Sequence, residues 1–226
     1  MKQNIIVIDN FYSNPEEVRN AALNADYPAP EDGFTYPGKN STDEFYNREI
    51  HKKFENILKQ PLIPSKPNGY FRVSLEKDTY KQYIHVDPSW EFGAVIYLTK
   101  PEDCIDEGGT SFWRHNTLNM ENIPQTDEEA QFHGYPTYRE AWGTTVYGDG
   151  LDKNKWTRYF MCPMRYNRLA VFRTHLWHSH NDNFGDCIEN GRLIQLFFFN
   201  PDPEWISQTE KLKKTMHKHK IRLEDN

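Results

Sequence analysis

From residue 70 onward, this sequence breaks into short segments in which apolar and polar residues alternate, with turn residues between them. The segments are 70–76 (YFRVSLE), 80–86 (YKQYIHV), 92–99 (FGAVIYLT), 109–115 (GTSFWRH), 168–174 (RLAVFRT) and 191–200 (GRLIQLFFFN). Many short strands separated by turns are typical of antiparallel sandwiches and barrels. Aromatic residues make up 15% of the chain, which also favours β structure. The last segment is apolar at almost every position, so we expect both of its faces to be covered.

The first 66 residues contain helical patterns instead of this alternation. We expect a buried strand over 5–8, a helix over 14–25, a loop over 27–42 and a second helix over 43–58. Ser13 and Glu16 have the spacing of a capping box, which predicts the start of the first helix. We interpret this region as a strand and two helices that buttress a sheet.

We interpret the 226 residues as one domain, because the chain is long enough for one core and shows no internal repeat. The expected parts are an N-terminal buttress over 1–66, a β core over 67–200 that contains an insertion over 116–160, and a C-terminal helix and tail over 201–226. The insertion has weak patterning and many aromatic residues, so we expect it to form part of a lid. The final helix is expected over 203–216, with Trp205, Leu212 and Met216 on one side.

Charge and composition narrow the class of partner. The net charge of −6 at pH 7 gives no general attraction to nucleic acid or to anionic membranes. No run of the sequence approaches the roughly 18 apolar residues of a membrane span, and the first apolar run is too short for a signal peptide. Three scattered cysteines argue against a disulfide framework. We therefore expect a cytoplasmic protein that acts on a small molecule or peptide and binds no membrane, with its oligomeric state left open.

A His-x-Asp pair occurs twice, and the sequence downstream separates the two copies. His85 and Asp87 lie at the end of a predicted strand, where residues i and i+2 leave the same face. A mononuclear non-haem iron site needs two imidazoles and one carboxylate on one side of the metal. For this pair, further histidines follow in the strand-like cluster 174–180 (THLWHSH). For the second pair, His180 and Asp182, only histidines in a basic tail follow, so the first pair is the better candidate.

Arg192 is the second unusual feature. It opens the most apolar segment of the chain, where a charge is costly unless it is paired. A dicarboxylic keto acid would supply a suitable anion, because a guanidinium group holds a carboxylate through two parallel hydrogen bonds. The alternative is an arginine at the edge of the core that pairs with a carboxylate of the protein itself.

Four segments, taken in order, resemble the iron(II)- and 2-oxoglutarate-dependent oxygenases, most nearly their prolyl-4-hydroxylase-like branch. The segments are His85-Val86-Asp87, 107–113 (EGGTSFW) after the strand AVIYLT, 168–179 (RLAVFRTHLWHS) and Gly191-Arg192. The resemblance covers about residues 70 to 200. It implies a mainly β fold with flanking α-helices, namely a double-stranded β-helix, which is a cupin-like jelly roll. The chain departs from the family in the long spacing before the distal histidine and in lacking a Ser or Thr two residues after the arginine.

The resemblance also implies a ligand set for Fe(II), namely His85, Asp87 and His178. Family strands of this form place the distal ligand six residues after a phenylalanine, which from Phe172 gives His178. His180 is the alternative distal ligand.

For the cosubstrate, the resemblance implies that Arg192 binds the far carboxylate of 2-oxoglutarate. Tyr83 shares the face of His85 by strand alternation, so we expect it either to donate a hydrogen bond to the cosubstrate or to be a tyrosine of the core. With O2, the enzyme would convert 2-oxoglutarate to succinate and CO2 and hydroxylate a C–H bond of an amino acid, peptide or small molecule.

Two other functions are compatible with these residues. One is a non-catalytic jelly-roll or cupin-like module in which the same three ligands bind zinc or no metal. The other is a nucleic-acid demethylase of the same superfamily, which the acidic net charge disfavours. Turnover of 2-oxoglutarate separates the first from an oxygenase, and salt-dependent binding of oligonucleotides tests the second.

Overall fold

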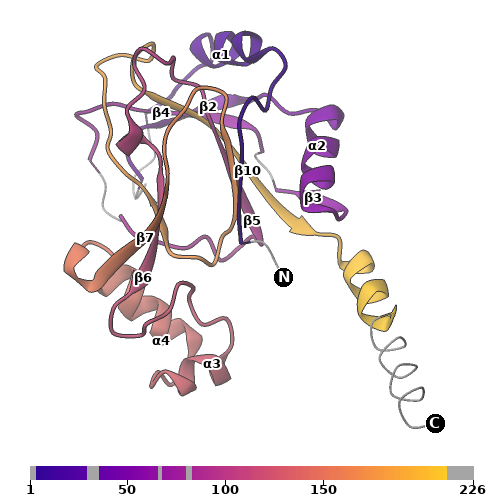
Figure 1. Cartoon of the computed structure of the whole chain (residues 1–226), viewed down its shortest axis with the longest axis vertical. Coiled ribbons are helices and arrows are strands. Elements are labelled where there is room, and N and C mark those ends of the chain that lie inside the picture. Colours follow the sequence, from indigo (N-terminus) through magenta and orange to yellow (C-terminus); the bar gives the residue numbers. More distant parts are fainter. Residues whose placement is uncertain (1–3, 30–35, 66–67, 80–82, 213–226) are drawn as a thin grey trace.

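Two antiparallel β-sheets face each other in this protein (Figure 1). The computed structural model describes residues 4–29, 36–65, 68–79 and 83–212. The larger sheet has the order β1 (Ile5–Ile8), β8 (Leu169–Arg173), β5 (Phe92–Tyr97), β10 (Arg192–Pro201), β4 (Tyr70–Ser74) and β2 (Lys39–Glu44), and β3 (Leu62–Pro64) also pairs with β10. The smaller sheet has the order β7 (Trp156–Cys162), β6 (Thr110–His115) and β9 (His178–His180). The predicted jelly roll is confirmed.

Strand β10 is the centre of the larger sheet and is covered on both faces, as its apolar sequence predicts. Alternate side chains of a strand point to opposite faces. Leu193 and Phe197 belong to the apolar cluster on the outer, helix-covered face, whereas Ile194 and Leu196 belong to a second cluster on the inner face, which is turned toward the smaller sheet. Arg192 shares the inner face with Ile194 because the two are separated by one residue.

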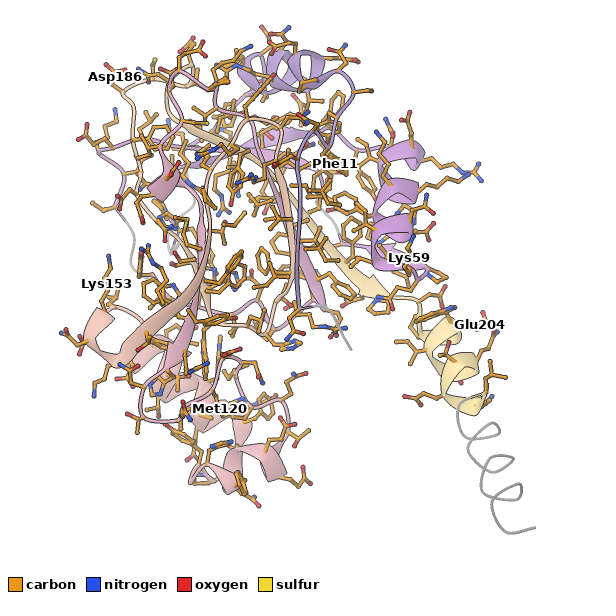
Figure 2. All side chains as sticks on the ribbon, viewed as in Figure 1. Phe11, Lys59, Met120, Lys153, Asp186 and Glu204 are labelled. Carbon is orange, nitrogen blue, oxygen red and sulfur yellow. The ribbon has the colours of Figure 1, made fainter. Side chains whose placement is uncertain are left out.

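Helices α1 (Pro15–Leu23) and α2 (Arg48–Leu58) cover the outer face of the larger sheet (Figure 1). Phe54 of α2 is fully buried, with its ring 4.9 Å from that of Phe197 and 4.7 Å from that of Phe199. Phe11 lies in the same layer of side chains, 5.5 Å from Phe54 between their ring centroids (Figure 2). Both helices therefore pack their apolar residues against the larger sheet.

Several N-terminal details differ from the prediction. Asn14 is the N-cap residue of helix α1, and its side chain makes no capping hydrogen bond. The predicted capping box therefore does not form. The segment predicted as a loop over 27–42 includes the first residues of β2. Strand β2 lies at an exposed edge of the sheet, so its sequence KNSTDE is polar and lacks the alternation that predicts a strand. Helix α2 begins after that strand, at Arg48, where the Asn47 side chain accepts a hydrogen bond from the Ile50 N–H. Strand β1 is likewise an edge strand and only half buried.

The insertion contains α3 (Asp127–Phe132), α4 (Tyr138–Trp142) and a π-helical turn over Gly143–Gly148. These helices lie together at one end of the two sheets, next to β6 and β7 (Figure 1). Buried His115 of β6 donates from Nε2 to Asp149 at 3.0 Å, because its Nδ1 accepts from the Leu118 N–H, and this bond ties the π-helical turn to the sheet. Strand β7 starts inside the range predicted as insertion, so the insertion ends earlier than expected.

The C-terminal helix covers residues 203–212 within the described part of the chain, and Leu212 is exposed. Met216, which was expected on the same helix, lies outside the described residues. None of the helices in the described ranges combines the length and the apolar character that a membrane crossing requires.

Candidate metal centre

The two histidines of the predicted triad are joined through their backbones. The His85 N–H donates to the His178 carbonyl at 3.0 Å, and the His178 N–H donates to the His85 carbonyl at 2.9 Å. This single antiparallel bridge is the only strand-like pairing of residues 83–87, so the strand predicted over 80–86 is wrong in its described part. The bridge places the two imidazole rings 4.4 Å apart, centroid to centroid.

Asp87 completes a compact set of three ligands. One ligand atom from each of His85, Asp87 and His178 lies within 4.8 Å of the other two. The Asp87 Oδ2 atom is 3.3 Å from the His178 Nε2 atom. The backbone of Asp87 is fixed as well, because its N–H donates to the Thr174 carbonyl at 3.0 Å and its carbonyl accepts from the Trp90 N–H at 3.3 Å.

The hydrogen bonds of both histidine rings leave Nε2 available as a ligand atom. Nδ1 of His85 lies 3.0 Å from the Tyr83 carbonyl, and Nδ1 of His178 lies 2.8 Å from the Leu176 carbonyl. A carbonyl oxygen only accepts, so each Nδ1 carries the proton. In the neutral ring, Nε2 is then the unprotonated nitrogen, and a carbonyl partner on the other ring nitrogen is the usual support of a metal-bound histidine.

The electrostatics of the set also suit a divalent cation. Burial lowers the pKa of His85 to about 4, with a smaller contribution from the neighbouring His178, so this ring is neutral at pH 7. Burial acts to raise the pKa of Asp87, but its contacts with the His178 and His85 rings outweigh burial, and the pKa lies below its ordinary value. A neutral imidazole and an ionised carboxylate are the protonation states that metal binding requires.

Arg192 lines the same cavity as the three ligands, and the cavity has a volume of about 250 Å³. Its side chain is buried, at 2% exposure, and its Nε donates to the Gly108 carbonyl at 2.7 Å. One terminal nitrogen also makes a long contact of 3.5 Å with the Gly109 carbonyl. Burial lowers the pKa of Arg192 to about 10, so the group stays charged at pH 7. No carboxylate of the described residues forms an ion pair with it, which rules out a described carboxylate as the alternative partner.

Tyr83 is buried in the core, which is the second of the two roles expected for it. It is not among the residues that line the cavity. Its ring lies 6.1 Å from the rings of Trp113 and His180, and the Lys153 ammonium group lies over it at 4.5 Å. The expected contact with the cosubstrate relied on strand alternation, which does not hold here because only His85 of this segment pairs with another strand. What Tyr83 contributes to the site is its backbone carbonyl, which fixes the His85 ring.

The three histidines of the cluster 174–180 separate in the structure. His178 belongs to the ligand set. His180 lines the cavity next to it, and burial together with the charge of Arg192 holds its pKa well below its ordinary value. His175 lines a separate cavity beside the insertion. The geometry therefore favours His178 over His180 as the third ligand.

Tyr36 and Arg72 are among the cavity residues that the sequence argument missed. Tyr36 lies with its ring 4.9 Å from the His85 ring, and its hydroxyl donates to Asp87 Oδ1 at 3.5 Å. Arg72 lines the cavity from β4. Tyr36 stands in a Pro- and Gly-rich segment that carries no periodic signal. Arg72 occupies a polar position of an alternating strand, which on its own predicts a solvent-facing side chain.

Comparison with protein families places the chain. A family model described as "Family of unknown function (DUF6445)" matches residues 1–199. The chain belongs to this family. A comparison of this DUF6445 protein with curated proteins finds no match.

Several solved structures with a similar fold either contain bound 2-oxoglutarate or are described as dependent on α-ketoglutarate. HygX from Streptomyces hygroscopicus, with nickel and 2-oxoglutarate bound, is 15% identical, with a TM-score of 0.53 over 89% of this chain and 84% of HygX. SnoK, a non-haem α-ketoglutarate-dependent carbocyclase from nogalamycin biosynthesis, is 15% identical, with a TM-score of 0.53 over 88% of this chain and 79% of SnoK. The epimerase SnoN is 12% identical, with a TM-score of 0.52 over 88% and 79%. At such identities the likeness establishes the fold of the DUF6445 protein.

Proposed function

We propose that this protein is an Fe(II)- and 2-oxoglutarate-dependent oxygenase. One observation carries the proposal: a His/Asp/His set and a buried arginine without a carboxylate partner among the described residues line the same cavity. The first element suits a metal with open coordination positions, and the second suits a dicarboxylic cosubstrate. The shared fold supports the same proposal. HygX was solved with 2-oxoglutarate bound, and SnoK and SnoN are described as dependent on it.

In this proposal His85 and His178 hold the metal through Nε2 and Asp87 holds it through a carboxylate oxygen. When bound, Fe(II) and 2-oxoglutarate together reduce O2, and the oxidative decarboxylation to succinate and CO2 drives hydroxylation of a substrate C–H bond. The chain's own part is to keep three ligands on one side of the metal through the His85–His178 backbone bridge. The carbonyls of Tyr83 and Leu176 prevent the two rings from rotating away.

Arg192 is the residue that we propose for the far carboxylate of the cosubstrate. Its Nε is fixed by Gly108, and its Nη1 atom has no hydrogen-bond partner among the described residues. A carboxylate that reaches this guanidinium replaces the water lost on burial and removes the cost of an uncompensated buried charge. Apolar side chains line part of the cavity: Val95, Phe172, Ile194 and Leu196.

For the substrate, we propose an amino acid, a peptide or another small molecule. HygX has been solved with hygromycin B bound, at a TM-score of 0.50 to this chain, and SnoK comes from nogalamycin biosynthesis, so the fold accommodates small molecules. Membership of the prolyl-4-hydroxylase-like branch stays a prediction. So does a lid role for the insertion over 116–160.

The test uses purified protein loaded with Fe(II) in the absence of O2. Adding 2-oxoglutarate should produce the metal-to-ligand charge-transfer absorption of a chelated keto acid, and admitting O2 should yield succinate, measured by mass spectrometry. Arg192→Met should raise the 2-oxoglutarate concentration for half-saturation at least about tenfold, because truncating one side of a buried charge pair costs about 2–5 kcal/mol.

Arg114→Met is the matched control, because Arg114 pairs with Glu121 on the smaller sheet and lies outside the cavity. It should leave the affinity for 2-oxoglutarate unchanged. Metal binding without either the absorption band or succinate would leave a non-catalytic metal-binding module and reject the oxygenase.

A further inference from the structure

Tyr36 lines the cavity from a closely packed turn that precedes β2. Gly38 in this turn has a φ of +86°, a backbone conformation that favours glycine. A Cβ atom at Gly38 would lie 2.1 Å from the Val73 carbonyl oxygen, so glycine allows the turn to approach β4. The Pro37 carbonyl accepts a hydrogen bond from the buried Ser74 hydroxyl at 3.2 Å. The two residues after Tyr36 therefore hold it against the larger sheet.

The side chain of Tyr36 contacts two of the three proposed metal ligands. Its ring centroid lies 4.9 Å from that of His85, with the two rings edge to face. Its hydroxyl makes a long hydrogen bond of 3.5 Å with Asp87 Oδ1. Tyr36 is the donor in this bond, because a carboxylate only accepts and a phenol keeps its proton at pH 7.

The two carboxylate oxygens of Asp87 have different neighbours. Oδ2 lies 3.3 Å from the His178 Nε2 atom, which is the ring nitrogen available to a metal. Oδ1 is the oxygen that accepts from Tyr36. An oxygen whose lone pair is engaged by a hydroxyl is a poorer metal ligand than one without such a donor. The geometry therefore favours Oδ2 as the ligand atom and engages Oδ1 elsewhere.

The number of carboxylate oxygens on the metal decides how many coordination positions stay open. Two imidazoles and one carboxylate oxygen occupy one face of an octahedral metal and leave the opposite face free. A keto acid that binds through two oxygens takes two of the free positions, and O2 needs the third. A carboxylate ligand that bound through both of its oxygens would occupy that third position. The proposed reaction therefore requires that Asp87 bind through one oxygen.

We propose that Tyr36 is a positioning residue that restricts Asp87 to one metal-binding oxygen. This inference rests on the proposed function. The hydroxyl engages Oδ1, and the ring is held by its contacts with His85 and with the Arg72 guanidinium group, whose carbon lies 5.3 Å from the ring centroid. The roles of ring and hydroxyl can be separated, because phenylalanine keeps the ring and lacks the hydroxyl.

The experiment compares Tyr36→Phe with the unsubstituted protein in the absence of O2. Both proteins are saturated with Fe(II) and 2-oxoglutarate and titrated with nitric oxide, which binds at the position that O2 needs and gives an electron paramagnetic resonance signal with Fe(II). Tyr36→Phe should keep the 2-oxoglutarate affinity within about threefold, but should need at least about ten times as much nitric oxide for half of the signal. The reason is that Oδ1 of Asp87 then competes for the open position.

Two controls show whether the loss has this cause. Without 2-oxoglutarate, Tyr36→Phe should bind nitric oxide as tightly as the unsubstituted protein, because open positions remain even when both oxygens of Asp87 bind the metal. Tyr27→Phe should leave every affinity unchanged, since the Tyr27 hydroxyl donates to the Ala22 carbonyl and Tyr27 does not line the cavity.

Three results would overturn the inference. The first is an unchanged nitric oxide affinity of Tyr36→Phe in the presence of 2-oxoglutarate. The second is an equal loss with and without 2-oxoglutarate, which would show a general disturbance of the metal site. The third is a loss of 2-oxoglutarate affinity of tenfold or more, which would place Tyr36 in the cosubstrate site. The oxygenase proposal would survive each of these results, since it fails only if the unsubstituted protein does not bind 2-oxoglutarate or form succinate.

Discussion

His85 and His178 exchange two backbone hydrogen bonds, although 92 residues of chain separate them. The position of both candidate ligands is therefore set by main-chain geometry, and the rings are oriented by carbonyls two residues earlier in the chain. A site built in this way is preorganised, because metal binding does not have to order the ligands first. The same bridge joins a segment outside the regular strands to β9 of the smaller sheet.

This geometry predicts which histidine is the third ligand. His178→Ala should weaken Ni(II) binding, measured by titration calorimetry, by at least about tenfold, since one of three protein ligands is lost. His180→Ala is the matched control, because His180 lines the cavity but lies outside the ligand set, and its metal affinity should stay within about threefold. The reverse order of the two variants would show that the distal ligand is His180.

The sequence was sufficient for the parts of the site that depend on strand order. Strand β10 could be identified from its unbroken apolar run, and the family resemblance placed His178 by its distance from Phe172, although the two residues lie in different strands, β8 and β9. The pair His85 and Asp87 was found although its segment is not a strand, because the ligand atoms of the two side chains nevertheless lie close together.

The parts that were missed depend on contacts between distant segments. Tyr36 contacts Asp87 from a segment whose sequence has no periodicity. Strand β2 is a polar edge strand, so its sequence does not alternate and does not predict its pairing. Arg72 follows the period-two pattern, but the pattern shows only which residues share a face. It does not show that this face encloses a cavity. Tyr83 does not share the cavity with His85 for a related reason, since alternation holds only while a strand remains paired.

The packing of α2 on the larger sheet predicts a large loss of stability when its central ring is removed. Phe54 is fully buried between Phe11, Phe197 and Phe199. Phe54→Ala should lower the free energy of unfolding in urea by about 3–5 kcal/mol, through lost burial and an unfilled cavity. Lys52→Ala, at an exposed position of the same helix, should change it by no more than about 0.5 kcal/mol. Similar losses for both variants would contradict this packing.

The ion pair that ties α1 to the core predicts a dependence of stability on pH. Glu16 accepts hydrogen bonds from the Lys100 ammonium and the Tyr166 hydroxyl, both at 2.5 Å, and these hold the pKa of Glu16 below its ordinary value of 4.5. A carboxyl whose pKa is lower in the folded state adds stability above its unfolded pKa, and this stability is lost as the pH falls through the folded pKa. Glu16→Gln should therefore cost about 0.2–1 kcal/mol at pH 7 and progressively less below about pH 4.

The measurement for Glu16 is urea unfolding of both proteins between pH 7 and pH 3. Lys100→Met serves as the companion variant. The double variant should be less destabilised than the sum of the two single variants, because each single change removes the same pair. A loss that stays constant down to pH 3 would show that the charge of Glu16 is not its cause.

Gly109 predicts a link between the fold and the cosubstrate site. A Cβ atom at this position would lie 2.0 Å from the Cys162 carbonyl oxygen, and that neighbour is backbone that cannot rotate away. Gly109→Ala should therefore force β6 and β7 apart, at a cost of about 1–3 kcal/mol in unfolding free energy. Gly109 follows Gly108, whose carbonyl fixes Arg192, so the shift should also weaken 2-oxoglutarate binding.

Gly143→Ala is the matched control for Gly109→Ala. A Cβ atom there meets nothing within 4 Å, and the backbone already has right-handed helical angles. Because alanine is the better helix former, this variant should be neutral or more stable by up to about 1 kcal/mol. Chemical denaturation and anaerobic 2-oxoglutarate titration of both variants provide the comparison. If Gly109→Ala were destabilised yet bound 2-oxoglutarate normally, the carbonyls of this turn would support the sheet without positioning the arginine, and the anchoring of Arg192 would have to come from β10 alone.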